Sequence, residues 1–199
     1  MGGCVLLGLR CWLNCSMAPE DVRLSKRMSY ALRHRPDEFG IKLDSEGWVD
    51  FETFVRALMG SGSSYSISRD AIVDVIEQSD KQRFELIAGR IRAAQGHSVT
   101  VDLGLDPAVP PDELWHGTVD RFLDSIIEGG LAPQGRQHVH LSGVFEVARE
   151  VGARRGTPVV LRVDAKSMAD AGSIFFQSAN GVWLTSNVPA QFLTPIEAK

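Results

Sequence analysis

Apolar residues recur at helical spacing near the start of the chain. Leu24, Met28 and the Ala31–Leu32 pair fall three to four residues apart, which predicts a helix over about 21–34. Pro36 ends that helix, because the residue before a proline avoids the α region. The Arg-His-Arg run just before this proline is therefore expected at a helix C-terminus.

A second amphipathic segment follows. Asp50 stands where a helix N-cap is expected, Val49 can pack onto Phe54 as a hydrophobic staple, and apolar residues recur over 51–59. Glycine and serine then dominate 60–64. The pattern predicts a second helix followed by a loop.

A third helix and a hairpin complete the first half of the chain. Ser68 can cap a helix over 69–78, where apolar positions again follow the helical period. Short strands are predicted over 84–86 and 90–93, with a turn at Gly89. Three helices followed by a β-hairpin favour a winged-helix-like lobe.

A proline-rich stretch at 106–112 predicts a linker between a first lobe at 17–105 and a second at 113–199. In the second lobe short apolar strands alternate with helices, and Asn180-Gly181 is typical of a tight turn. The strands are expected near 114–116, 139–141, 159–163, 174–176 and 182–184, and the helices over 120–128 and 144–151. The predicted fold class is α+β.

Composition narrows the classes of partner. The chain has 199 residues, 44% of them hydrophobic and 23% charged, which is ordinary for a globular protein. Its formal net charge is -4, so it lacks the broad basic surface that grips nucleic acid by releasing many counterions. If RNA is the substrate, a few placed arginines must hold it.

The first sixteen residues differ from the rest of the chain. They contain all three cysteines, Cys4, Cys11 and Cys15, so the remainder has no thiol and a disulfide framework or zinc site is not expected. We interpret 1–16 as a disordered tail or an over-long start, with Met17 as the initiator. No stretch reaches the length of a membrane span. The expectation is a cytoplasmic protein without membrane contact, most simply a monomer.

The five histidines all occur beside glycine, serine or arginine. They are His34, His97, His116, His138 and His140. Any one of them is more often a satisfied core or turn residue than a functional one, but together they favour function. The same holds for the arginines at 33, 83 and 136, which can equally serve as a helix cap, a solvated strand residue or a loop residue.

Several common catalytic motifs are absent from the sequence. It has no phosphate-binding P-loop, no GxGxxG fingerprint, no HExxH or CxxC pair and no GxSxG elbow. Kinases, Rossmann dehydrogenases, zinc enzymes of these types and serine hydrolases therefore lack support.

Seven short strings occur in an order that points to one enzyme family. They are LSKRMSYALRHRP, EGWVD, DKQRF, IRAAQGHS, LWHGT, RQHVHLS and NGVWLT. In this order and spacing, from about Leu24 to Leu193, the chain resembles the tRNA 2′-phosphotransferase family. It departs mildly from the family pattern at Trp115, where tyrosine is frequent.

The resemblance implies a winged-helix-like, RNA-binding N-terminal lobe and an NAD-binding C-terminal lobe of the ADP-ribosyltransferase type. The implied catalytic residues, in the cleft between the lobes, are Arg33, His34, Arg83 and Arg136. The implied NAD contacts are His116, Gly117, Thr118, His140 and Ser142. The implied substrate contacts are Arg92, His97 and Ser98.

The implied reaction consumes NAD as a co-substrate and needs no metal. An internal 2′-phosphate of RNA, which is expected to be tRNA-like, attacks the nicotinamide ribose and expels nicotinamide. The ribose 2″-hydroxyl then attacks the phosphate, which releases ADP-ribose 1″,2″-cyclic phosphate and RNA with a 2′-hydroxyl. Arginine suits this chemistry because its fork binds phosphate oxygens in pairs, and His34 is one candidate for proton transfer or phosphate contact.

Three alternatives stay open. A protein-modifying ADP-ribosyltransferase often has a glutamate near the last core strand, whereas NGVWLTSN holds no carboxylate. An enzyme that ADP-ribosylates a terminal phosphate and stops there would leave a stable adduct. A non-catalytic winged-helix protein should have a basic recognition helix, but 68–78 carries Asp70, Asp74 and Glu77 against Arg69.

Overall fold

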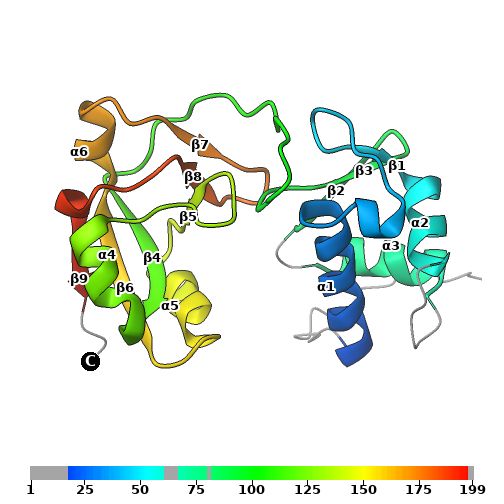
Figure 1. Cartoon of the computed structure of the whole chain (residues 1–199), viewed down its shortest axis with the longest axis horizontal. Coiled ribbons are helices and arrows are strands. Elements are labelled where there is room, and N and C mark those ends of the chain that lie inside the picture. Colours follow the sequence, from blue (N-terminus) through cyan, green and yellow to red (C-terminus); the bar gives the residue numbers. More distant parts are fainter. Residues whose placement is uncertain (1–17, 61–66, 80–81, 197–199) are drawn as a thin grey trace, which may run out of the picture.

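The computed structural model of the chain describes residues 18–60, 67–79 and 82–196, and it combines helices with antiparallel sheets. The predicted α+β class is therefore confirmed. The interpretation of 1–16, the initiator Met17 and most of the predicted 60–64 loop lie outside the described residues. Figure 1 shows two groups of elements side by side, which we call the N-terminal and C-terminal halves.

The N-terminal half consists of helices that pack beside a small sheet (Figure 1). Its elements are α1 (Pro19–Arg33), η1 (Asp37–Phe39), β1 (Val49–Asp50), α2 (Phe51–Gly60), α3 (Arg69–Glu77), β2 (Phe84–Ile87) and β3 (Arg90–Ala93). The sheet is antiparallel with the order β1-β3-β2. The three predicted helices and the hairpin are thus present, and Val49–Asp50 adds a strand that the sequence pattern assigned only to a helix entry.

Capping side chains fix where two of these helices begin. The Asp50 carboxylate accepts a hydrogen bond from the Thr53 amide at 2.8 Å, and the Ser68 hydroxyl accepts one from the Ala71 amide at 3.1 Å. Each satisfies a backbone donor that has no partner inside the helix. Both predicted caps are confirmed, and α1 ends at Arg33, as the position of Pro36 requires.

The C-terminal half contains two three-stranded antiparallel sheets with the orders β4-β6-β9 and β5-β8-β7. Its elements are β4 (Glu113–Val119), η2 (Asp120–Phe122), α4 (Leu123–Gly129), β5 (Val139–Leu141), α5 (Phe145–Ala153), β6 (Pro158–Asp164), α6 (Ala165–Asp170), β7 (Phe175–Gln177), β8 (Trp183–Thr185), η3 (Ala190–Phe192) and β9 (Leu193–Ile196). Backbone hydrogen bonds of 2.8 Å in both directions between Trp115 and Ser142 join the two sheets.

Two elements of this half were not predicted. Helix α6 is too short to show a helical period, and its start is fixed by the Asp164 carboxylate, which accepts from the Ser167 amide at 3.0 Å. Strand β9 contains Pro195, which argues against a central strand. Because β9 lies at the edge of its sheet, the missing amide donor of that proline is tolerated.

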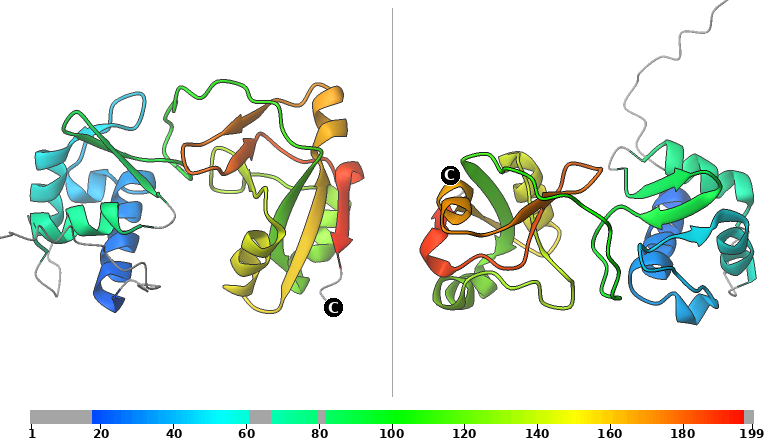
Figure 2. Two further views of the ribbon diagram at one scale, coloured as in Figure 1. Left: turned by 180° about the vertical axis from the view of Figure 1, so that it is seen from behind. Right: turned by 90° about the horizontal axis from the view of Figure 1, so that it is seen from above.

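Each half has its own hydrophobic core. The first core gathers the buried faces of α1, α2 and α3 over the β1-β3-β2 sheet, and the second lies around β4, β6, β7 and β8. The segment that connects the two halves is attached to the C-terminal half, because the Ala108 amide donates to the Phe175 carbonyl at 2.8 Å. Figure 2 shows this connection running from β3 across to the C-terminal half.

Alternation along the strands gives the β5-β8-β7 sheet two unlike faces. Val139, Leu141, Phe175 and Trp183 are buried in the second core. His140, Leu184 and Phe176 are paired across the strands and therefore share the opposite face. That face is turned toward the segment 96–103 of the N-terminal half, since Gly96, His97, Leu103, His140 and Leu184 line one small cavity. The candidate site is built on this face.

Candidate functional site

Arg33 brings the end of α1 next to the loop that follows β3. Its Nη2 donates to the Arg83 carbonyl oxygen at 3.4 Å. Gly96 has φ +88°, a backbone conformation that favours glycine, and a Cβ placed on it would lie in ordinary contact with Arg33 Nη1, at 3.5 Å. The structure thus brings together two of the arginines that the sequence analysis selected.

His34 is held by the same loop. Its Nδ1 lies 3.0 Å from the Ser98 hydroxyl, and the Ser98 amide donates to the Arg33 carbonyl at 2.9 Å. Burial, followed by the charges of Arg33 and Arg136, lowers the pKa of His34. The imidazole is therefore neutral at pH 7, and it can use one ring nitrogen for Ser98 and the other for a ligand.

Arg136 approaches from the C-terminal half. Its Nη1 lies 3.5 Å from His140 Nδ1, and because a guanidinium only donates, the Nδ1 atom must accept and the ring proton lies on Nε2. Burial, Arg136 and Arg33 lower the pKa of His140 to about 3. His140 is thus a neutral side chain beside two cations.

The cations lack counter-charges. Burial, Arg136 and Arg83 lower the pKa of Arg33 to about 10, and burial and Arg155 lower that of Arg136. Among residues 18–60, 67–79 and 82–196, none of Arg33, Arg83 and Arg136 forms an ion pair with a carboxylate. Arg33 and Arg83 are half-buried and Arg136 is exposed, so their guanidinium groups are accessible to an anion from outside the chain.

His97 lies between the arginines and the sheet face. It is 2% exposed, and neither ring nitrogen has a hydrogen-bond partner within the described part of the chain. Burial, Arg33 and Arg92 lower its pKa to about 4. His97 and His140 line the same cavity of about 10 Å³, and His140 Nε2 is also buried without a partner among the described residues. These nitrogens can bind a ligand atom without first breaking an internal hydrogen bond.

Backbone contacts connect the two halves at this point. The Gln137 amide donates to the His97 carbonyl at 3.2 Å, and its side-chain Nε2 donates to the Val101 carbonyl at 2.9 Å. Gln137 follows Arg136 directly, so these bonds position Arg136 relative to Arg33. The sequence analysis missed Gln137, although it lies inside the RQHVHLS string.

The residues selected for NAD contacts divide into two groups. His116 Nδ1 lies 3.1 Å from the His140 carbonyl oxygen, to which it donates, so His116 and His140 are adjacent and His116 Nε2 carries a lone pair. Burial is the main cause of the lowered pKa of His116. Gly117 and Thr118 instead support packing: a Cβ on Gly117 would lie 1.8 Å from the Ala148 carbonyl oxygen of α5, and Thr118 is buried.

Ser142 has local partners. Its hydroxyl donates to the Val144 carbonyl at 2.9 Å and accepts from the Val144 amide at 3.1 Å, just before α5. It lies across from Trp115 at the end of β5. The Ser142 backbone therefore pairs with the residue just before His116, while the Ser142 side chain is hydrogen-bonded to the residue that precedes α5.

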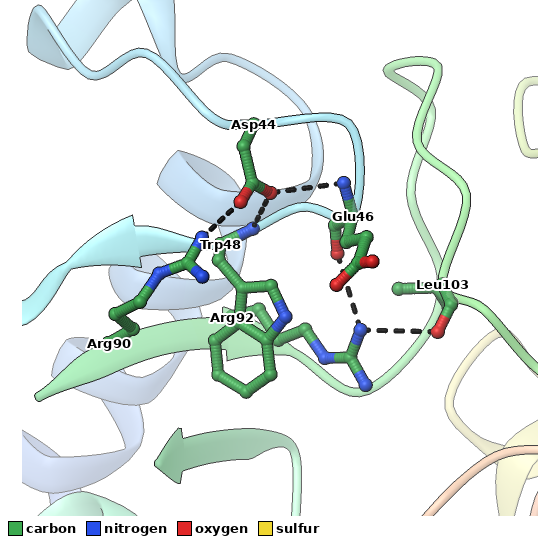
Figure 3. A network of polar contacts seen from close by, with 6 residues as sticks. All are labelled: Asp44, Glu46, Trp48, Arg90, Arg92 and Leu103. Carbon is green, nitrogen blue, oxygen red and sulfur yellow. Dashed lines mark hydrogen bonds and ion pairs between the residues drawn. The ribbon is translucent and has the colours of Figure 1, made fainter. Parts of the chain in front are cut away.

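Arg92 differs from the arginine cluster in its contacts, several of which Figure 3 shows. Its Nη1 donates to the carbonyl oxygens of Leu103 at 3.2 Å and Glu46 at 3.4 Å, and its Nη2 lies 3.1 Å from Glu85 Oε2. The guanidinium also stacks over the Trp48 ring, 4.4 Å from its centroid. These contacts hold the segment after β3 in place, and the predicted role of Arg92 in substrate binding stays a prediction.

Arg155 is a basic neighbour that the sequence analysis did not select. Its charge contributes to the lowered pKa values of Arg136 and His116, so it adds to the positive potential at this end of the C-terminal half. The adjacent pair Arg154-Arg155 was the available signal. The described residues contain no group of His, Cys, Asp and Glu side chains that could hold a metal ion, and none of their helices is long and apolar enough to cross a membrane.

Comparisons with known proteins match most of the chain. Residues 19–187 match the model of the RNA 2′-phosphotransferase, Tpt1/KptA family. A probable RNA 2′-phosphotransferase of Hahella chejuensis is 46% identical over 175 residues, which is 87% of this chain and 93% of the relative. Proteins with the same description from Pseudomonas aeruginosa and Streptomyces griseus are each 49% identical, over 85% and 86% of this chain and 93% and 95% of theirs.

Proposed function

Since the chain belongs to the RNA 2′-phosphotransferase, Tpt1/KptA family, we propose that it removes an internal 2′-phosphate from RNA by transferring it to NAD. The observation that carries this proposal is the cluster of Arg33, Arg83 and Arg136, which gathers from both halves without a carboxylate partner among the described residues. A phosphate dianion supplies the charge that the cluster lacks.

The proposed reaction balances in two steps. A phosphate oxygen forms a bond to the anomeric carbon of the nicotinamide ribose while the bond to nicotinamide breaks. The ribose 2″-hydroxyl then bonds to phosphorus, loses its proton, and displaces the RNA 2′-oxygen, which takes up a proton. The products are nicotinamide, ADP-ribose 1″,2″-cyclic phosphate and RNA with a 2′-hydroxyl.

The arginines act in both steps by holding charge in place. Three guanidinium groups can offer paired N–H donors to the phosphate oxygens and keep the attacking oxygen in line with the breaking bond. In the second step they stabilise the extra negative charge that develops around phosphorus. The lowered pKa values of Arg33 and Arg136 fit this role, because an anion bound beside them restores the stability of the charged form.

His34 is suited to move the proton of the second step. Its lowered pKa keeps the ring neutral at pH 7, and its contact with Ser98 fixes the ring beside Arg33. With Nδ1–H donating to Ser98, Nε2 can accept the 2″-hydroxyl proton. Ser98 then acts as the positioning residue, and Arg92 and His97 support the loop that carries it.

NAD would lie on the side of the cluster formed by His116 and His140. The free lone pair of His116 and the unpartnered Nε2–H of His140 offer an acceptor and a donor to ribose or phosphate groups. The half-buried Gly117 and Ser142 and the buried Thr118 lie on β4 and at the end of β5 near this side. When bound, NAD supplies the ribose that accepts the phosphate and the leaving group that drives the first step.

The family also supports an arrangement of lobes. We propose a winged-helix-like, RNA-binding lobe at 17–105, a linker at 106–112 and an ADP-ribosyltransferase-type lobe at 113–199. The helices and hairpin of the N-terminal half and the two sheets of the C-terminal half are compatible with it. A tRNA-like substrate, a cytoplasmic location and a monomeric state belong to the same proposal.

The test is a reaction of the purified chain with a short RNA that bears one internal 2′-phosphate, with and without NAD. We expect NAD-dependent 2′-hydroxyl RNA and ADP-ribose cyclic phosphate in equal amounts. Stable ADP-ribosylated RNA without cyclic phosphate would show instead an enzyme that stops after the first step. Inorganic phosphate released without NAD would contradict the proposal.

A further inference from the structure

A cavity of about 440 Å³ opens at the end of the sheet face that carries His140. Continuing the β5-β8-β7 register by one residue places His138, Ser186 and Ile174 in a row beyond the last paired residues. All three line the cavity, together with Phe176, Asn187 and the loop 171–173. His138 also lines the small cavity next to His140 and His97, so the two spaces adjoin.

The lining of this cavity mixes apolar side chains with uncharged polar ones. The rings of His138 and Phe176 meet edge to face, with centroids 5.9 Å apart and an interplanar angle of 65°. Ile174 is 57% exposed, which is unusual for so large an aliphatic side chain beside a site. No Asp, Glu, Lys or Arg lines the cavity, and burial lowers the pKa of His138, so the lining is uncharged at pH 7.

The rim of the cavity carries hydrogen-bonding groups. The Ser186 hydroxyl donates to Asn187 Oδ1 at 3.2 Å, which leaves the Asn187 amide nitrogen as a donor. Ser173 adds a second hydroxyl. An uncharged slot with aromatic walls and a polar rim suits a planar ring that has donors and acceptors at its edge, as a nucleobase does.

The position of the cavity favours RNA as the source of that base. Of the residues proposed for NAD, Ser142 pairs with Trp115 at the end of β5 opposite His138, and His140 lies between the two. The cavity instead lies beside the segment that carries Arg136, on the side of the arginine cluster. We propose that the cavity beside His138 binds a nucleobase of the RNA substrate and thereby sets which nucleotide presents its 2′-phosphate; this inference rests on the proposed function.

The test measures equilibrium binding without NAD. The probe is a labelled pentanucleotide RNA with a 2′-phosphate on its third nucleotide, and matched probes lack one base in turn. In the wild-type protein we expect the loss of one particular base to weaken binding about tenfold, within the range for stacking of a base on aromatic side chains. His138→Ala and Ile174→Ser should weaken binding of the complete RNA by a similar factor.

The decisive measurement combines the variants at His138 and Ile174 with the RNA that lacks the base in question. If that base occupies the cavity, the variants should bind the complete RNA and the base-free RNA almost equally, because the same contact cannot be lost twice. Ile127→Ser is the matched control, since Ile127 is an exposed isoleucine on α4, and it should bind as the wild type does. The side chains of Ile174 and Ile127 are both exposed, so substitution of either residue should leave the protein folded.

Two results would overturn the inference. Additive losses at all positions would show that no base sits in the cavity. Weaker binding of ADP-ribose, with RNA binding unchanged, would assign the cavity to the adenine of NAD. Turnover by the wild-type protein is measured alongside, because failure of the proposed function would appear there, whereas failure of this inference alone would leave wild-type turnover intact.

Discussion

Two groups of arginines in the same molecule have opposite surroundings. Arg92 is enclosed by Glu85, two backbone carbonyls and the ring of Trp48. Arg33 and Arg136, by contrast, lie close enough to each other for their charges to interact, with no carboxylate between them in the described chain. Arg92 is paired with a carboxylate and stabilises the fold, whereas arginines whose charges meet no carboxylate among the described residues indicate an anionic ligand.

The largest effect on activity is expected when Arg136 is replaced. Arg136→Ala should lower kcat by about 100-fold or more, because it removes donors that act on charge developing in the transition state. Thermal unfolding should change little, since the substitution relieves repulsion with Arg33. Steady-state kinetics and a melting curve measure the two effects. If the variant melts far below the wild type, Arg136 has a structural role like that of Arg92 instead.

The opposite pattern is expected for Arg92. Arg92→Met should cost about 3 kcal/mol of unfolding free energy, because the guanidinium and Glu85 are 13% and 17% exposed and the carboxylate would be left unpaired. Denaturant unfolding measures this, and the double variant with Glu85→Met should recover part of the loss. Retained stability would show that the network of Figure 3 is dispensable.

His97 lies within the influence of both arginine groups and should make stability depend on pH. Its folded pKa of about 4 lies below the unfolded value of about 6.5. Its contribution is therefore fully present above pH 6.5 and is lost as the pH falls toward 4. Between pH 7 and pH 5 the loss should be about 2 kcal/mol. His97→Gln should flatten this part of the unfolding profile, and the remaining slope should report the other histidines with lowered pKa values, His34, His116, His138 and His140.

The smallest effect is expected at Arg162, which lies outside both groups of arginines. Arg162 pairs with Glu113 at 3.0 Å, but both side chains are more than 40% exposed. Arg162→Ala should change unfolding free energy by less than about 1 kcal/mol and leave kcat unchanged. It is the matched control for Arg136→Ala, and an activity loss in it would mean that reduced net charge alone explains both variants.

The sequence predicted local features better than partnerships. Asp50 and Ser68 could be identified as caps because a cap is decided within three residues. Helix α6 and strand β9 were missed, since one is too short for a period and the other contains proline at a sheet edge.

Within the candidate site, the pattern selected Arg33, Arg83, Arg92 and Arg136 but could not separate their surroundings. The difference depends on Glu85 and the Leu103 carbonyl, which reach Arg92 only through the tertiary fold. Gly117 had been assigned to NAD binding by resemblance, and its structural environment adds a packing reason, because α5 leaves no space for a side chain.

Gln137 makes the integrity of the whole site depend on a short strap of two hydrogen bonds, to the His97 and Val101 carbonyls. Breaking them requires neither core to melt, so the chain can lose its alignment while most of its structure persists. Heat should therefore inactivate the enzyme at a lower temperature than the one at which its helical structure is lost. The catalytic rate would then report a rise in temperature earlier than the helix content does.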